Sequence, residues 1–332
     1  MKAVRVNAFN MAAPAEAATV TEVPVPEPKD GEALVRMTMR PVDPADLFSL
    51  MGVYPGFTTA LPATVGLEGA GVIEKPAAGG KFAKGQRVTV SGFPAEHGNG
   101  TWTEYICLKE ADLTAVPDSV TDVQASQFLV NPLTAYGMLK TSGTPKGEYL
   151  LFNAAGSALC RQLTGLCKHE GVKSIGLVRR KEQCKELVDA GLTHCFCLED
   201  ADVVAQIKAA TGGKGAYAAL DCIGGPGTEA LGMAVRQGGT VYVYGAMGGL
   251  QATVPVPGLI FAGLTVTGFW LGPWMRSMSP EEQVRVKDEV MAHIASGVMP
   301  VGAGEVFPLD KVQEAIAHST KVARGGKVLL SS

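Results

Sequence analysis

The sequence lacks any cysteine pair with C-x-x-C spacing, although it contains seven cysteines. An odd number of cysteines without such a pair is typical of reduced thiols in an intracellular protein, not of a disulfide framework. Charged residues make up only 18% of the chain and hydrophobic residues 46%, which excludes a disordered chain. The formal net charge of −3 is too balanced for a protein that neutralises phosphates, so we expect no nucleic-acid partner.

One long stretch, between Arg236 and Arg276, has no acidic or basic residue at all. A membrane helix needs about 20 apolar residues in a row, whereas glycines and prolines interrupt this stretch repeatedly. We therefore predict buried strands joined by a loop and no membrane segment. The first residues carry charges and show no apolar run with a cleavage site, which favours a cytoplasmic location.

The length of 332 residues predicts about two domains. Residues 1–120 are β-rich, with short apolar or alternating runs separated by proline and glycine. From residue 121 strands alternate with helices. The expected strands are 149–153, 174–178, 194–198, 216–221, 240–245 and 264–270. Six strands with helical crossovers predict an α/β fold with a parallel, doubly wound sheet.

The first of these strands ends in Asn153-Ala-Ala-Gly-Ser-Ala-Leu-Cys160, just before a helix. A strand, a turn of small residues and a helix N-terminus can bind a pyrophosphate, because free N–H groups and the helix dipole point at the anion. Only Gly156 remains of the three glycines that such a loop usually has, and Ala158 and Cys160 stand at the other two places. An ordinary strand-to-helix turn is the alternative.

The next strand leads directly into Arg179-Arg180-Lys181. An acidic residue at this place would bind the ribose of NAD, whereas cations accommodate the 2′-phosphate of NADP. The cluster predicts NADPH as the cofactor. The alternative is a solvated basic start of a helix.

A β-rich domain, a six-stranded region and a mixed C-terminal tail together resemble the medium-chain dehydrogenase/reductase superfamily. The resemblance implies a discontinuous GroES-like substrate and catalytic domain, 1–120 with 275–332, and a Rossmann NADPH-binding domain, 121–274. Zinc-dependent members carry Gly-His-Glu where this chain has Gly66-Leu-Glu-Gly69. Since residues 1–120 contain only one cysteine, Cys107, and one histidine, His97, a zinc site cannot be assembled in the usual way and we expect no metal.

Several strings are similar to the 2-enoyl thioester reductases of fatty acid synthesis and, next to them, to the quinone oxidoreductases. These strings are Val42-Asp-Pro-Ala-Asp46, Gly52-Val-Tyr-Pro55, Gly100-Thr-Trp102, Asn131-Pro-Leu-Thr-Ala-Tyr-Gly-Met-Leu139 and Gly268-Phe-Trp-Leu-Gly-Pro-Trp274. The chain departs from the enoyl reductases at Asp43, where they usually have Asn, and in the lost glycines of the phosphate loop.

The resemblance implies that Tyr54 is the proton donor, because a neutral phenol can hydrogen-bond a developing enolate and supply its proton. It also implies an NADPH shell with Asn131 at the nicotinamide end. The rest of that shell is Gly156, Ser157, Ala158 and Leu159 at the pyrophosphate, Arg179, Arg180 and Lys181 at the 2′-phosphate, and Tyr244, Gly245, Ala246, Met247, Phe269, Trp270, Leu271 and Lys327. Alternatives are a packing role for Tyr54, a core position for Trp270 and a solvated position for Lys327.

The expected function is NADPH-dependent reduction of the C=C bond of a 2-enoyl thioester of CoA or acyl carrier protein. One alternative is an NADPH:quinone or alkenal reductase, and another is an NADPH-binding protein with little turnover. The resemblance implies a homodimer, because superfamily members commonly pair through edge strands of the cofactor domain, and the apolar strand 264–270 is the expected edge. The family includes mitochondrial proteins, so the mitochondrial matrix is the alternative location.

Overall fold

The chain folds into two compact units in a computed structural model that describes residues 1–57, 60–321 and 325–332. The first unit comprises Met1–Asn131, Pro280–Ala295 and Val301–Ser332, and the second comprises Pro132–Ser279 and Ser296–Pro300. The sequence placed the main boundaries at 120/121 and 274/275. In the described ranges no helix combines the length and the apolar character needed to cross a membrane.

The first unit is built on two sheets. The smaller has the order β2-β1-β4, and the larger has the order β15-β16-β3-β5-β6-β8, with β7 also paired to β3. The strands are β1 (Lys2–Val6), β2 (Thr19–Glu22), β3 (Glu32–Pro41), β4 (Ala63–Thr64), β5 (Ala70–Lys75), β6 (Arg87–Val90), β7 (Tyr105–Lys109), β8 (Leu113–Ala115), β15 (Val306–Pro308) and β16 (Leu329–Ser331). The helices are α1 (Pro14–Ala17), α2 (Pro44–Met51), α3 (Asp122–Ala125), α11 (Pro280–Ala295) and α12 (Val312–Ser319), with 3-10 turns at Pro94–His97, Glu110–Asp112 and Leu309–Lys311.

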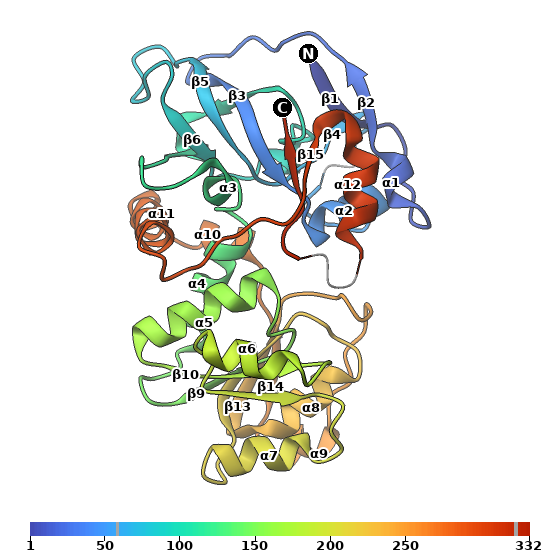
Figure 1. Cartoon of the computed structure of the whole chain (residues 1–332), viewed down its shortest axis with the longest axis vertical. Coiled ribbons are helices and arrows are strands. Elements are labelled where there is room, and N and C mark those ends of the chain that lie inside the picture. The colour runs from blue at the N-terminus through green and yellow to red at the C-terminus, as the bar shows by residue number, and fades with distance from the viewer. Residues whose placement is uncertain (58–59, 322–324) are drawn as a thin grey trace. The chain divides into compact units, whose positions relative to one another are not determined.

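The C-terminal strand returns to the first unit, as the resemblance implied. β16 lies beside β3 at the C-terminus of the chain (Figure 1). The two strands pair antiparallel, with Leu330 opposite Arg40. Val328, Leu329 and Leu330 are fully buried, so apolar burial holds this distant segment in the sheet.

The second unit is a doubly wound parallel sheet, and the predicted α/β fold class is confirmed. Its six strands have the order β11-β10-β9-β12-β13-β14. All strands are parallel, and the order in which the chain adds them to the sheet reverses between β9 and β12. The strands are β9 (Tyr149–Phe152), β10 (Lys173–Val178), β11 (His194–Cys197), β12 (Ala216–Asp221), β13 (Val235–Val243) and β14 (Thr265–Gly268). The helices are α4 (Asn131–Ser142), α5 (Ala158–Glu170), α6 (Gln183–Asp189), α7 (Val203–Ala210), α8 (Gly227–Ala234), α9 (Val256–Phe261) and α10 (Leu271–Arg276).

Two expected boundaries in this unit were wrong. The strand expected at 240–245 begins earlier, because α8 ends at Ala234 and β13 begins at Val235, whose branched side chain is buried in the core. The edge strand was expected to reach Trp270, but β14 ends at Gly268 and a new helix, α10, starts at Leu271.

Candidate active site

The turn between β9 and α5 has the geometry of an anion site. Ser157 is the N-cap of α5, and its hydroxyl accepts a hydrogen bond from Cys160 N at 3.3 Å. Ala155 N donates to Leu177 O at 3.0 Å, which ties the turn to the neighbouring strand β10. The first-turn N–H groups of Ala158 and Leu159 have no acceptor within the helix, so they are available to an anion.

Cys160 is compatible with this geometry although it replaces an expected glycine. Its side chain is fully buried, with Sγ 3.4 Å from Asn153 O and 3.7 Å from Tyr244 Oη. The thiol therefore points into the unit. Burial raises the pKa of the Cys160 thiol, which remains protonated and behaves as a small apolar group.

The cations Arg179, Arg180 and Lys181 follow directly after β10 and are exposed. β9 and β10 are parallel neighbours, with Gly176 opposite Phe152, so the cations and the phosphate turn lie at the same edge of the sheet. Lys181 Nζ lies 3.9 Å from Asp200 Oδ2, a long contact between largely exposed groups. The expected position of all three cations is thus met, whereas their role stays a prediction.

Asn153 and Asp221 connect the ends of two neighbouring strands, a role that was not expected from the sequence. Asn153 Nδ2 donates to Asp221 Oδ1 at 2.6 Å, and Asn153 Oδ1 accepts from Cys222 N at 3.0 Å. Asp221 also accepts from Gly224 N at 3.0 Å and from Thr228 Oγ1 at 2.6 Å. The signal in the sequence was a polar residue at the end of each of two apolar strands.

Tyr244 to Met247 continue from the C-terminal end of β13. The Tyr244 hydroxyl faces two thiols, those of Cys160 and Cys222, and burial raises the pKa of this phenol well above its usual range. Met247 is 65% exposed. This segment therefore joins the same edge of the sheet as the phosphate turn.

Phe269, Trp270 and Leu271 lie between β14 and α10. Phe269 and Leu271 are buried, and the Phe269 ring lies 6.0 Å from that of Trp274. Trp270 is 40% exposed, so its alternative interpretation as a core residue was wrong.

Tyr54 lies in the first unit, in the loop after α2. Gly52 caps that helix with a φ of 77°, and a Cβ at this position would lie 2.7 Å from Phe9 Cγ, so only glycine fits. Tyr54 is partly buried and lines a small pocket with Phe9, Val53 and Phe57. Its ring packs at the edge of the core and also borders a hollow.

Lys327 is buried, so its alternative as a solvated residue was wrong. Its ammonium group forms an ion pair with Asp43, the N-cap residue of α2. Asp46 and Glu68 belong to the same buried group of side chains, since the charges of Asp43 and Lys327 act on both of them. Three buried carboxyls around one lysine were not foreseen. The sequence feature that could have indicated this buried group is the presence of three acidic residues within the strings Val42–Asp46 and Gly66–Gly69.

Asn131 is the first residue of α4 and is buried. The preceding residue, Val130, donates its N–H to Glu68 Oε2 at 2.8 Å, which fixes the start of the helix near the acidic group. Tyr54, Asn131 and Lys327 thus lie in the first unit, whereas the other expected site residues lie in the second.

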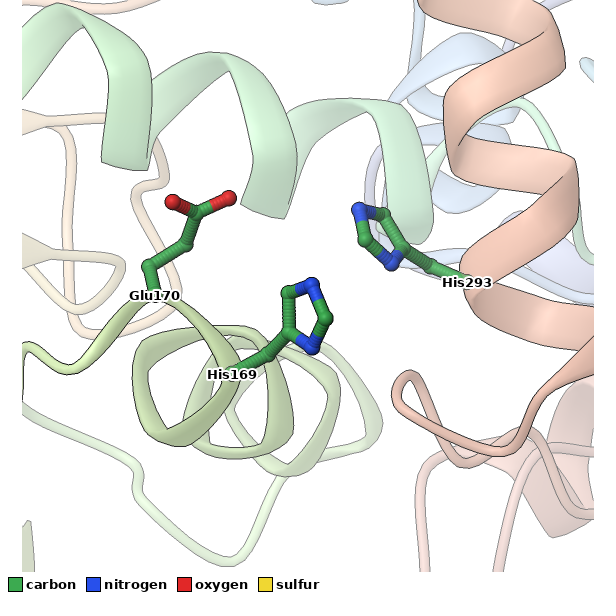
Figure 2. Close-up of side chains that lie close together, drawn as sticks. All are labelled: His169, Glu170 and His293. Carbon is green, nitrogen blue, oxygen red and sulfur yellow. The ribbon is translucent and has the colours of Figure 1, made fainter.

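Three potential metal-ligating side chains lie outside the expected site. His169 and Glu170 end α5 in the second unit, and His293 is on α11 of the first (Figure 2). Because His293 belongs to a different unit from His169 and Glu170, we assign no metal site to these residues.

Comparisons with known proteins agree with this architecture. Residues 29–118 match the alcohol dehydrogenase GroES-like domain, and residues 163–285 match a family described as zinc-binding dehydrogenase. The chain is 32% identical to a mitochondrial enoyl-[acyl-carrier-protein] reductase of Caenorhabditis elegans over 86% of this chain and 82% of that protein. The chain therefore belongs to the medium-chain dehydrogenase/reductase superfamily of oxidoreductases.

Within this superfamily the chain groups with the zinc-independent enoyl reductases and quinone oxidoreductases, as the resemblance indicated. A crystal structure described as an NADPH:quinone reductase of Bacillus thuringiensis matches with a TM-score of 0.91 at 27% identity, covering 100% of this chain and 98% of that one. A mycobacterial protein complexed with NADPH matches with a TM-score of 0.86 at 26% identity, covering 100% of both chains.

Proposed function

We propose that this protein uses NADPH to reduce the C=C bond of 2-enoyl thioesters of CoA or acyl carrier protein. The observation that carries this proposal is the 32% identity to a mitochondrial enoyl-[acyl-carrier-protein] reductase over most of both chains. The strings around Tyr54, Trp102 and Trp270 support the same substrate class.

The second unit fits a bound dinucleotide. The N-terminus of α5 offers backbone N–H groups, and a Cβ added at Gly156 would lie only 3.1 Å from Gln183 Nε2, so glycine keeps this turn open. Arg179, Arg180 and Lys181 carry the preference for NADPH, because charge-assisted hydrogen bonds to a 2′-phosphate are strong. Residues 156–159 hold the pyrophosphate, and 244–247 and 269–271 complete the shell in this unit.

NADPH, when bound, supplies a hydride to the β-carbon of the substrate. Negative charge then builds on the thioester oxygen, and the α-carbon must take a proton. A phenol, with an ordinary pKa of about 10, is protonated at neutral pH and can donate to the developing enolate. Tyr54 is assigned this role, and its partly buried place beside a pocket suits a group that must exclude water while reaching a ligand.

A quinone or alkenal reductase is the second candidate, favoured by the likeness to the Bacillus thuringiensis protein. It would use the same cofactor residues with a different acceptor.

The test follows NADPH absorbance with purified protein and crotonyl-CoA, with a simple quinone, or with no acceptor. Rapid oxidation with crotonyl-CoA alone supports the proposal. Turnover with the quinone alone replaces it by the second candidate. NADPH binding without turnover on either acceptor would leave a cofactor-binding protein and defeat both enzymatic interpretations.

A further inference from the structure

Two buried carboxyl oxygens of the first unit have no hydrogen-bond donor among the described residues. These atoms are Asp43 Oδ2 and Glu68 Oε1, on residues that are each 1% exposed. The other oxygen of each group is engaged, because Asp43 Oδ1 accepts from Lys327 Nζ and Glu68 Oε2 accepts from Val130 N at 2.8 Å. Unpaired buried oxygens are costly, so this pair needs a physical explanation.

The two side chains can satisfy each other only with a proton. Asp43 and Glu68 lie within hydrogen-bonding reach of one another, yet two carboxylates offer acceptors alone. A carboxyl that carries a proton has one O–H donor and a carbonyl oxygen that accepts, so it has a donor end and an acceptor end, as an amide has. One proton placed between the two unpaired oxygens therefore satisfies both.

The local charges favour the same state. If Asp43, Asp46 and Glu68 were all ionised, Lys327 would balance only one of three buried negative charges. Burial, and then the charge of Asp43, raise the pKa of Glu68 and that of Asp46, while Lys327 opposes the shift.

Asp46 is a poor place for this proton. Its Oδ2 accepts from Asp43 N at 2.8 Å and its Oδ1 accepts from Leu67 N at 3.1 Å, so a proton there would compete with a backbone donor. The contact between Asp43 and Glu68 is where a proton adds a hydrogen bond without breaking one.

We propose that Asp43 and Glu68 share one proton between Asp43 Oδ2 and Glu68 Oε1, and that this acid pair positions the Lys327 ammonium group. The pair leaves Asp43 Oδ1 free to bind Lys327 and keeps the net charge of the group low. Asp43 and Glu68 are positioning residues that act through Lys327. Only the link to cofactor binding rests on the proposed function, because Lys327 belongs to the expected NADPH shell.

The first experiment counts protons in the absence of cofactor, by following the unfolding of the first unit against pH. A carboxyl that keeps its proton in the folded state loses it in the unfolded state above about pH 4.3. The contribution of this one carboxyl to the folding equilibrium constant therefore falls about tenfold per pH unit as pH rises towards its raised pKa in the folded state. Asp43→Asn and Glu68→Gln each replace the proton by an amide donor, and each should remove one proton from this dependence.

The double variant, Asp43→Asn with Glu68→Gln, gives the sharpest outcome. The new amide carbonyl at position 43 would face Lys327 and the one at position 68 would face Val130 N. Both NH₂ groups would then point at each other. The double variant should therefore lose more folding stability than the sum of the losses in the two single variants. Asp118→Asn, at an exposed aspartate, is the control and should keep the wild-type pH dependence. Single variants with that same dependence, or additive effects in the double variant, would overturn the proposal.

An infrared spectrum contains a band of the protonated carboxyl, and this band would not change between variants if Asp43 and Glu68 had only a structural role. The carbonyl stretch of a buried protonated carboxyl should be present in the wild type at neutral pH and absent in both single variants. Its persistence in both variants would also overturn the shared proton.

The link to the cofactor has its own readout. Asp43→Val removes the acceptor of Lys327 and should raise the KM for NADPH about tenfold with little change in kcat, while Asp43→Asn restores wild-type KM. Equal KM values for NADPH in Asp43→Val and Asp43→Asn would contradict the positioning role. A protein that never binds NADPH would instead refute the proposed function, and the proton count would still decide the shared proton.

Discussion

Asn153 Nδ2 lies 2.6 Å from Asp221 Oδ1, so that a buried hydrogen bond between side chains joins the C-terminal ends of β9 and β12. These strands are neighbours at the point where the strand order reverses. In doubly wound sheets this reversal is where ligands bind, and a rigid rim keeps the two loops in fixed positions. The bond therefore stabilises the strand ends that carry the proposed cofactor site.

Asn153→Ala should destabilise the second unit. It leaves Cys222 N without its acceptor and removes one donor from Asp221, and an unpaired buried group costs about 1–3 kcal/mol. Thermal unfolding should show a clear drop, and Gln237→Ala, at an exposed amide of the same unit, should show none. An unchanged midpoint for Asn153→Ala would mean that the bond contributes no stability.

Arg179→Ala should remove most of the preference for NADPH over NADH. Charge-assisted hydrogen bonds contribute about 1.5–3 kcal/mol, which corresponds to roughly a tenfold to hundredfold change in the ratio of kcat/KM values. Lys185→Ala removes an equal charge from the exposed side of α6 and serves as the control. If Arg179→Ala keeps the wild-type ratio, another group recognises the 2′-phosphate or none does.

Tyr54→Phe should lower kcat by about one order of magnitude or more, because the phenol proton is lost while the ring remains. NADPH affinity, measured by fluorescence titration, should stay nearly unchanged. Tyr105→Phe, in β7 of the same unit, is the matched control. Near-normal turnover of Tyr54→Phe would leave the tyrosine a packing role only.

The sheet edge of the second unit has an open strand and exposed apolar side chains, and we expect a homodimer to form through it. β14 pairs only with β13 within the described residues, and α9 buries none of its side chains. Ile260 is 66% exposed and Phe261 is 78% exposed, which is unusual for apolar side chains that stay in contact with water. Pairing of two edges would cover the open strand.

We expect a dimeric mass by light scattering at micromolar concentration and a monomeric mass for the double variant Ile260→Asp/Phe261→Asp. Val188→Asp, at an exposed apolar residue of α6, should remain dimeric. A wild-type monomer would contradict the dimer outright.

Local patterns in the sequence were enough to predict the parallel sheet and its phosphate turn. Short apolar strands followed by glycine or polar residues repeat along the second unit, and parallel topology follows from their alternation with helices. The positions of Ser157 and Arg179 could also be predicted from the sequence. A residue just after a parallel strand lies at the edge of the sheet formed by the C-terminal strand ends, which is where ligands bind. The ends of strands, such as the end of β14 at Gly268, could not be predicted from the sequence, because a strand ends where its pairing with the neighbouring strand ends.

The amino-acid order alone determined that residues 149–268 form a doubly wound sheet, because helix and strand preferences act over a few neighbouring residues. Only the tertiary structure decided that Lys327 pairs with Asp43 and that Glu68 lies beside them. These residues are far apart along the chain, and the β16–β3 pairing brings them together by burying apolar strands. Their chemistry depends on exclusion from water, which no local pattern encodes.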